Sequence, residues 1–160
     1  MYKLILAALD DSANAQLALE QAIKQAKLCD ARLHLLHVVN LFDLASADVG
    51  MPDPTGLRNQ AKTYSEKVLA NARATAQAAG IETSSNTRSC WGGGSEVAEQ
   101  IVEEANELMV DLIVMGTHGR GGMLHLMLGS VAEAVMRHTY SPLLIIRNPE
   151  QQPGKAPMLQ

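Results

Sequence analysis

The sequence has few aromatic residues, and it has no long run of basic or of apolar residues. Only Tyr2, Phe42, Tyr64, Trp91 and Tyr140 are aromatic among 160 residues, so the core has to be built from Ala, Leu, Ile, Val and Met. A formal net charge of −4 with no Lys or Arg run argues against a DNA or RNA partner. No stretch reaches the ~20 apolar residues that span a bilayer, so we expect a cytoplasmic protein without a membrane partner.

Neither the cysteines nor the paired histidines are spaced like metal ligands. Cys29 and Cys90 lie far apart and outside any CxxC or Cys/His spacing, which argues against a disulfide framework and against a zinc site. We expect both to be buried or bystander thiols. His34 and His37 differ by three positions in a predicted strand, so their side chains should lie on opposite faces. We therefore predict core or edge histidines and no metal site.

Apolar runs alternate with helical periods along a chain that has the size of one compact domain. Strands are predicted at 4–9, 33–39, 81–89, 111–115 and 143–147. Helices are predicted at 15–26, 57–79, 97–108 and 131–138. The alternation predicts an α/β fold, a single-domain five-stranded parallel sheet within residues 1–147 that has helices on both faces.

Three segments lack these patterns. Residues 40–56 combine Asp, Gly and Pro with small apolar residues, so we expect a long mobile loop. The tail 148–160 has three prolines and little apolar content, and we expect it to be disordered. Trp91 and the three glycines after it form either a second anion loop or a tight strand-to-helix connection. The missing Lys or Arg at the helix start favours the connection.

The most informative motif runs from Gly116 to Ser130 and reads GTHGRGGMLHLMLGS. Glycines let backbone N–H groups approach an anion, and a helix start adds unpaired donors and the positive end of its dipole. The N–H groups near Gly119 and Gly129 and the Ser130 hydroxyl therefore form a candidate phosphate site. Alternatively, the glycines are turn residues and Ser130 is an N-cap. The spacing fits neither GxxxxGKS/T nor GxGxxG, so the residues alone leave both interpretations open.

The spacing Gly116-2x-Gly119-9x-Gly129-Ser130 resembles the nucleotide-binding motif of the universal stress protein family. The segments MGTHGRGG, LGSVAEAV and SPLLIIR are similar to the C-terminal half of that family, and LAALDDSANAQLALEQAI and LHLLHVV to its first β-α-β unit. The resemblance covers residues 3–147. It implies a Rossmann-like, adenine nucleotide alpha hydrolase-like fold and an ATP- or AMP-binding regulatory module of the stress response. It also implies a homodimer that pairs through the last strand, Leu143 to Arg147.

The resemblance also assigns the base and the ribose to residues at the ends of the first two strands. Asp10 would contact the ribose, the backbone of Val38 would pair with the adenine edge, and Ala8 would line the base pocket. A carboxylate accepts two hydroxyl protons well, whereas beside phosphates it would need a metal ion. Mg²⁺ is therefore a further candidate cofactor.

The resemblance assigns the phosphates to the glycine motif. By resemblance, Gly116 and Gly119 would let the loop close on the ribose and phosphate, and Gly129, Ser130 and Val131 would bind the phosphate chain. Arg120 is either a forked donor to the outer phosphates or a solvated loop arginine.

No catalytic residue is predicted. His118 and His125 lie within the motif, but spacing fixes no Ser, Cys or acidic partner beside them. A weak ATPase is therefore the second hypothesis after the regulatory module. A nucleotide-free dimeric interaction protein of the same fold is the third.

Overall fold

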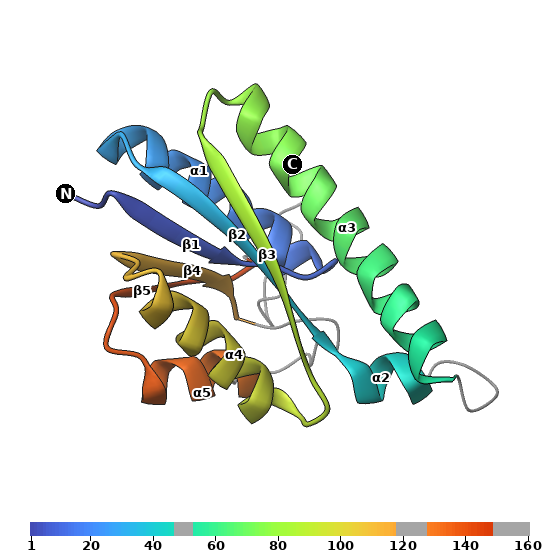
Figure 1. The fold of residues 1–160 in the computed structure, drawn as a ribbon. Coiled ribbons are helices and arrows are strands. Elements are labelled where there is room, and N and C mark those ends of the chain that lie inside the picture. The colour runs from blue at the N-terminus through green and yellow to red at the C-terminus, as the bar shows by residue number, and fades with distance from the viewer. Residues whose placement is uncertain (47–52, 118–127, 149–160) are drawn as a thin grey trace, which may run out of the picture.

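The computed structural model describes residues 1–46, 53–117 and 128–148. Its elements follow in the order β1 (Leu4–Ala8), α1 (Ala13–Cys29), β2 (Arg32–Asn40), α2 (Leu41–Ser46), α3 (Pro54–Ala78), β3 (Thr83–Cys90), α4 (Gly94–Glu107), β4 (Leu112–Gly116), α5 (Ser130–His138) and β5 (Leu143–Ile146). The strands form one parallel sheet in the order β3-β2-β1-β4-β5 (Figure 1). The predicted five-stranded parallel α/β fold is confirmed. The tail 149–160 lies outside the described residues.

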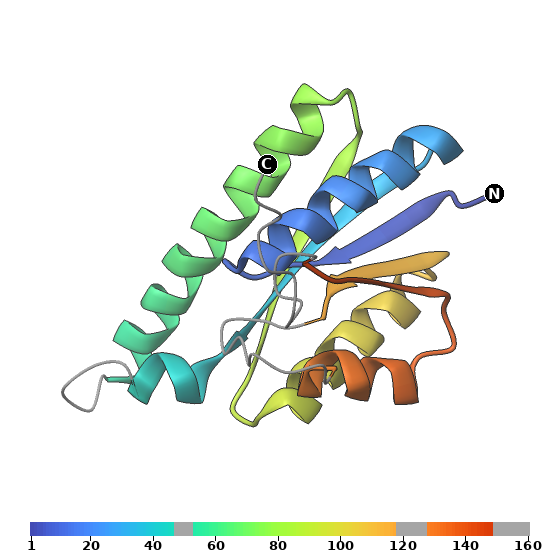
Figure 2. The same cartoon turned by 180° about the vertical axis from the view of Figure 1, so that it is seen from behind.

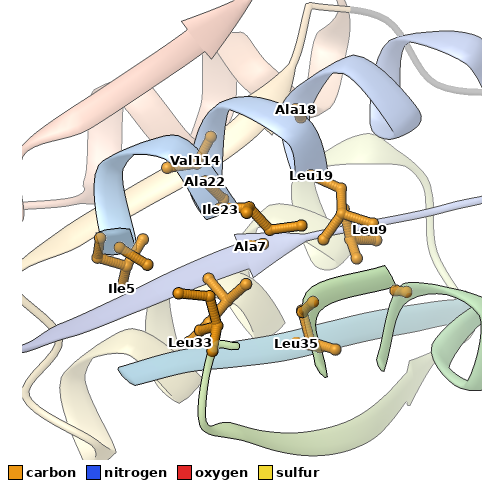
Figure 3. Close-up of a cluster of buried hydrophobic side chains, with 14 of the residues drawn as sticks. Ile5, Ala7, Leu9, Ala18, Leu19, Ala22, Ile23, Leu33, Leu35 and Val114 are labelled. Atoms are coloured by element: carbon orange, nitrogen blue, oxygen red, sulfur yellow. The ribbon is translucent and has the colours of Figure 1, made fainter. Parts of the chain in front are cut away.

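Helices cover both faces of the sheet, and this explains why its central strand is apolar throughout. Figure 2 shows α1 and α3 on one face and α4 and α5 on the other. Ile5, Leu6 and Ala7 of β1 are fully buried because each side chain meets a helix layer on its own face. The first layer packs against Ile5, Ala7, Leu33 and Leu35 (Figure 3).

Helix α1 has the apolar stripe that its sequence predicts. Ser12 is its N-cap, and the Ser12 hydroxyl accepts a hydrogen bond from the Ala15 N–H at 3.1 Å. The inward stripe of Ala18, Ala22 and Ile23 packs on β1 and β2 (Figure 3). Since most of these residues are small, α1 lies close to the sheet.

The prediction of a loop over 40–56 is wrong at both ends. α2 begins directly after β2, because the Asn40 carboxamide oxygen accepts hydrogen bonds from the N–H groups of Phe42 at 3.0 Å and Asp43 at 3.4 Å. α3 begins at Pro54, because Oδ1 of Asp53 accepts from the N–H groups of Thr55 and Gly56, each at 2.8 Å. Residues 47–52 lie outside the described residues.

Strand β3 confirms the polar strand predicted at 81–89, and one buried carboxylate explains part of its polarity. Glu104 of α4 accepts hydrogen bonds from the Asn86 amide, at 3.0 Å, and from Arg88 Nε, at 2.5 Å, and lies 2.8 Å from His34 Nε2. Burial alone raises the pKa of Glu104, but hydrogen bonds from Arg88, Asn86 and His34 outweigh it, so this pKa lies below its usual value. The network ties α4 to β2 and β3.

The two histidines lie on opposite faces of β2, as predicted. His34 contacts Glu104 beneath α4, whereas Nδ1 of His37 lies 3.0 Å from the Ser65 hydroxyl of α3. Within the described ranges there is no group of three metal-ligating side chains. Both cysteines are free, with Cys90 buried and Cys29 half-buried. No described helix is long and apolar enough to cross a membrane.

Candidate functional site

The candidate site lies where the strand order reverses. From β1 the chain passes through α1 to β2 on one side, whereas β4 lies on the other side of β1. Ala8 at the end of β1 pairs with Leu36 of β2 and with Met115 of β4. Asp10 and Gly116 therefore follow at the same edge of the sheet. Ligands of open α/β sheets bind at such an edge, beyond the carboxyl ends of the strands.

Two residues that were assigned to the base and one that was assigned to the phosphates lie together on the face that α4 and α5 cover. The side chains of Ala8, Val38 and Val131 are half-buried and all pack against the cluster beneath these helices, whose centre includes Leu6 and Leu36. Leu128 packs against the same cluster. The structure thus brings residues from β1, β2 and α5 to one apolar surface at the carboxyl edge.

One carboxylate oxygen of Asp10 accepts a hydrogen bond from the protein, and the other makes none within the described ranges. Oδ1 accepts a hydrogen bond from the Ser12 N–H at 2.9 Å, which fixes the side chain beside the start of α1. Oδ2 makes no hydrogen bond with any residue in the described ranges, and the side chain is half-buried. An oriented carboxylate of this kind can accept hydroxyl protons from a ligand.

The glycine motif begins and ends at one point of the sheet. The Thr117 N–H donates to the Ile146 carbonyl, and the Thr117 carbonyl accepts from the Gly129 N–H, both at 2.9 Å. The start of α5 is therefore held at the carboxyl end of β4. Gly119 and Arg120, and also His118 and His125, lie outside the described residues.

Helix α5 starts without a side-chain cap. Its N-cap is Gly129, which has no side chain to bond the first-turn N–H groups, and Ser130 is the first helical residue. The interpretation of Ser130 as an N-cap is therefore wrong. Its hydroxyl does not cap the helix, and the residue is exposed. The first-turn N–H groups of α5, together with this hydroxyl, form a donor set suited to an anion.

A second glycine-capped helix start lies beside the first, and the sequence interpretation did not include it in the site. Gly93 is the N-cap of α4 and also makes no side-chain cap bond. A Cβ added to Gly94 would lie 2.4 Å from the Ser130 hydroxyl oxygen, so glycine is required for this approach. The glycine run after Trp91 is the tight connection between β3 and α4 that was favoured. In the sequence, only the glycines after Trp91 indicated that α4 and α5 come into close contact at Gly94 and Ser130.

Gly116 has a packing role in the structure. A Cβ at this position would lie 2.8 Å from Cβ of Asn14 and 3.1 Å from its backbone carbon. Asn14 is buried in the first turn of α1. The end of β4 can therefore lie against the start of α1 only without a side chain at residue 116.

These features define a doubly wound α/β protein whose candidate site lies at the switch point of a parallel sheet. The model of the universal stress protein family matches residues 1–147, and the chain belongs to that family. A curated relative, universal stress protein YxiE from Bacillus subtilis, is 33% identical over 153 residues, which cover 92% of this chain and all of the relative.

Two solved structures share this fold. The structure of MJ0577, reported as a hypothetical protein whose biochemical function was assigned from structure, is 27% identical and superposes with a TM-score of 0.77 over 92% of this chain and 97% of its own. A universal stress protein from Archaeoglobus fulgidus, solved in complex with dAMP, shares the fold at 20% identity with a TM-score of 0.63. The match covers 91% of this chain and 98% of that one.

The close approach at Gly116 predicts a stability effect. Gly116→Ala should lower the free energy of unfolding by about 1–3 kcal/mol, because its Cβ meets the backbone of Asn14 as well as a side chain. Urea denaturation measures the change. The control is Gly56→Ala, whose Cβ would meet only the Asp53 side chain at 3.5 Å or more within α3. Equal midpoints for the two variants would contradict this role of Gly116.

Proposed function

We propose that this universal stress protein binds an adenine nucleotide, AMP or ATP, at the switch point and acts as a small regulatory module. The observation that carries the proposal is the uncapped start of α5, fixed at the carboxyl edge that also carries Asp10. An anion at that helix start and a hydroxylated group at Asp10 are the two ends of a nucleoside phosphate.

The base belongs on the apolar surface between these two ends. In our proposal Ala8 and Val131 contact the faces of the adenine, and the backbone of Val38 pairs with its polar edge. Backbone pairing suits Val38 because its side chain already packs against the cluster beneath α4 and α5.

The phosphates belong at Gly129, Ser130 and Val131, with Gly119 and Arg120 approaching from the loop. The positive end of the α5 dipole and the Ser130 hydroxyl favour a negative charge there. Since no cluster of three metal-ligating side chains occurs in the described ranges, any Mg²⁺ that accompanies ATP would be held mainly by the phosphates and water. The structure of the Archaeoglobus fulgidus protein with dAMP supports the class of ligand through the shared fold alone.

The regulatory role follows from where the phosphates would lie. They contact the segment between Thr117 and Gly129, whose two ends are joined by a hydrogen bond. A nucleotide with more phosphates would make more contacts with that segment. The surface offered to a partner protein would then depend on which nucleotide is bound.

The ribose role of Asp10 can be tested against its neighbour. Asp10→Ala should weaken AMP binding about ten- to hundredfold, because hydrogen bonds to a charged acceptor contribute about 1.5–3 kcal/mol. Isothermal titration calorimetry measures the affinity. Asp11→Ala removes the same charge from the adjacent, exposed position and should bind AMP as the parent protein does.

Unchanged AMP affinity in Asp10→Ala would refute the ribose role. Phosphate release from ATP should be followed in the same samples. Release that Asp10→Ala abolishes without loss of ATP binding would instead favour the ATPase.

We also propose a homodimer that pairs through β5. This strand forms one edge of the sheet in the described residues, and beside it Tyr140 is fully exposed and Met136 is 54% exposed. Exposed apolar side chains beside an unpaired strand edge are typical of an interface.

Sedimentation velocity should show a dimer at micromolar concentration, and Tyr140→Glu should shift it toward monomer. Phe42→Glu changes an exposed aromatic residue on α2 at the other side of the sheet and should leave the dimer intact. A monomeric parent protein would contradict the proposal.

A further inference from the structure

A groove separates the first half of α3 from the end of β3. It has a volume of about 820 Å³, and its lining includes Leu57 of α3, Val39 of β2 and Trp91. Figure 1 shows α3 running beside β3, with α2 where β2 ends. Val38 packs beneath α4 and α5. Because adjacent side chains of a strand point to opposite faces, Val39 points to the other face of the sheet. The groove therefore lies on the face of the sheet opposite the proposed adenine site.

The strand wall of the groove is a row of hydroxyl groups. Ser84, Asn86 and Arg88 direct their side chains to His34 and to Glu104, on the α4 face. Side chains alternate along a strand, so Ser85, Thr87 and Ser89 face α3 instead. The hydrogen bond from Arg73 of α3 to the Ser85 hydroxyl, at 2.8 Å, agrees with this. All three hydroxyl residues line the groove.

One side of α3 carries three cations, two of which have no hydrogen bond or ion pair within the described ranges. Arg58, Lys62 and Arg73 lie along one side of α3, because positions four and eleven residues apart nearly coincide in angle on a helix. Arg73 does not line the groove, and its guanidinium donates to the Ser85 hydroxyl of β3. Further toward the start of α3, Arg58 and Lys62 line the open part, where no described hydrogen bond or ion pair engages them. The lining also includes the Glu66 carboxylate.

The charge of the remaining arginine in the lining is already matched. Arg88 pairs with Glu104 and Glu107 on α4, each at 2.5 Å. The α3 wall of the groove thus carries two unpaired cations, Arg58 and Lys62, and one carboxylate of opposite charge, Glu66. The β3 wall carries the hydroxyl groups of Thr87 and Ser89. A phosphate monoester is complementary to this arrangement, because its oxygens can accept from a guanidinium, an ammonium and hydroxyl groups together.

Trp91 provides an apolar surface for the organic part of a ligand in the groove. This residue lines the groove and is 60% exposed, which leaves an aromatic face available. Such a face suits the C–H surface of a sugar ring, while the hydroxyl row suits the ring hydroxyls. We propose that this groove binds a phosphorylated sugar, with the phosphate between Arg58, Lys62 and Ser89, independently of the adenine site.

The only tryptophan of the chain reports on this site directly. Addition of glucose 6-phosphate should change the Trp91 fluorescence saturably, and calorimetry should give one site per chain with or without saturating AMP. Glucose alone and inorganic phosphate alone should each bind at least tenfold more weakly. No saturable change up to about 10 mM glucose 6-phosphate, or displacement by AMP, would overturn the proposal.

Matched charge variants locate the binding. Arg58→Gln with Lys62→Gln should weaken glucose 6-phosphate binding at least tenfold and leave AMP affinity unchanged. Lys24→Gln with Lys27→Gln removes the same charge from exposed positions on α1 and should change neither affinity. Equal affinity of the Arg58/Lys62 variant and the parent protein would contradict the site. Equal affinity for inorganic phosphate and glucose 6-phosphate would contradict a sugar-specific groove.

Discussion

Close approach between helix starts and strand ends is the constraint on which the rest of the site depends. Each of α1, α4 and α5 follows a strand of the parallel sheet in the chain, and the bond from the Gly129 N–H to the Thr117 carbonyl holds the start of α5 at the end of β4. Their positive dipole ends therefore gather at the carboxyl edge. Two glycines bring them together. Gly116 lets the end of β4 lie against Asn14 of α1, and Gly94 lets α4 lie against Ser130 of α5. Larger residues would separate the donors at this edge and weaken their joint effect on an anion.

The alternation of side chains along β2 and β3 divides the polar chemistry between two faces of the sheet. On the α4 face, buried Glu104 gathers His34, Asn86 and Arg88, and its pKa is held down by these donors despite burial. On the α3 face, hydroxyl groups of β3 line an open groove instead. Strand β3 can therefore be polar although helices cover both of its faces. Its side chains on the α4 face bond to a buried carboxylate, and those on the α3 face line an open groove.

Apolar patterns in the sequence were enough to predict four of the strands and the four long helices, because each of these elements has an apolar face of its own. The polar strand β3 was predicted instead from its content of Thr and Ser. It failed for α2, whose start depends on a single capping side chain, Asn40, rather than on an apolar stripe. Asp10 and Gly116 each stand at the end of a strand that was predicted to be parallel, so a common edge follows from the predicted fold. The contact of Gly94 with Ser130 and the bond of His34 with Glu104, 70 residues away, depend on packing that no local pattern encodes. No local pattern distinguishes Arg58 and Lys62 from an ordinary solvated helix face, because the groove that they line forms only where α3 lies beside β3.

The central claim is that the switch point holds an adenine nucleotide. The most direct test is to purify the protein without added nucleotide, denature it by heat, and identify any released nucleotide by chromatography and mass spectrometry. We expect AMP or ATP in the supernatant, or binding of one of them by calorimetry if purification has stripped the site. An empty supernatant together with no heat of binding for either nucleotide would contradict it.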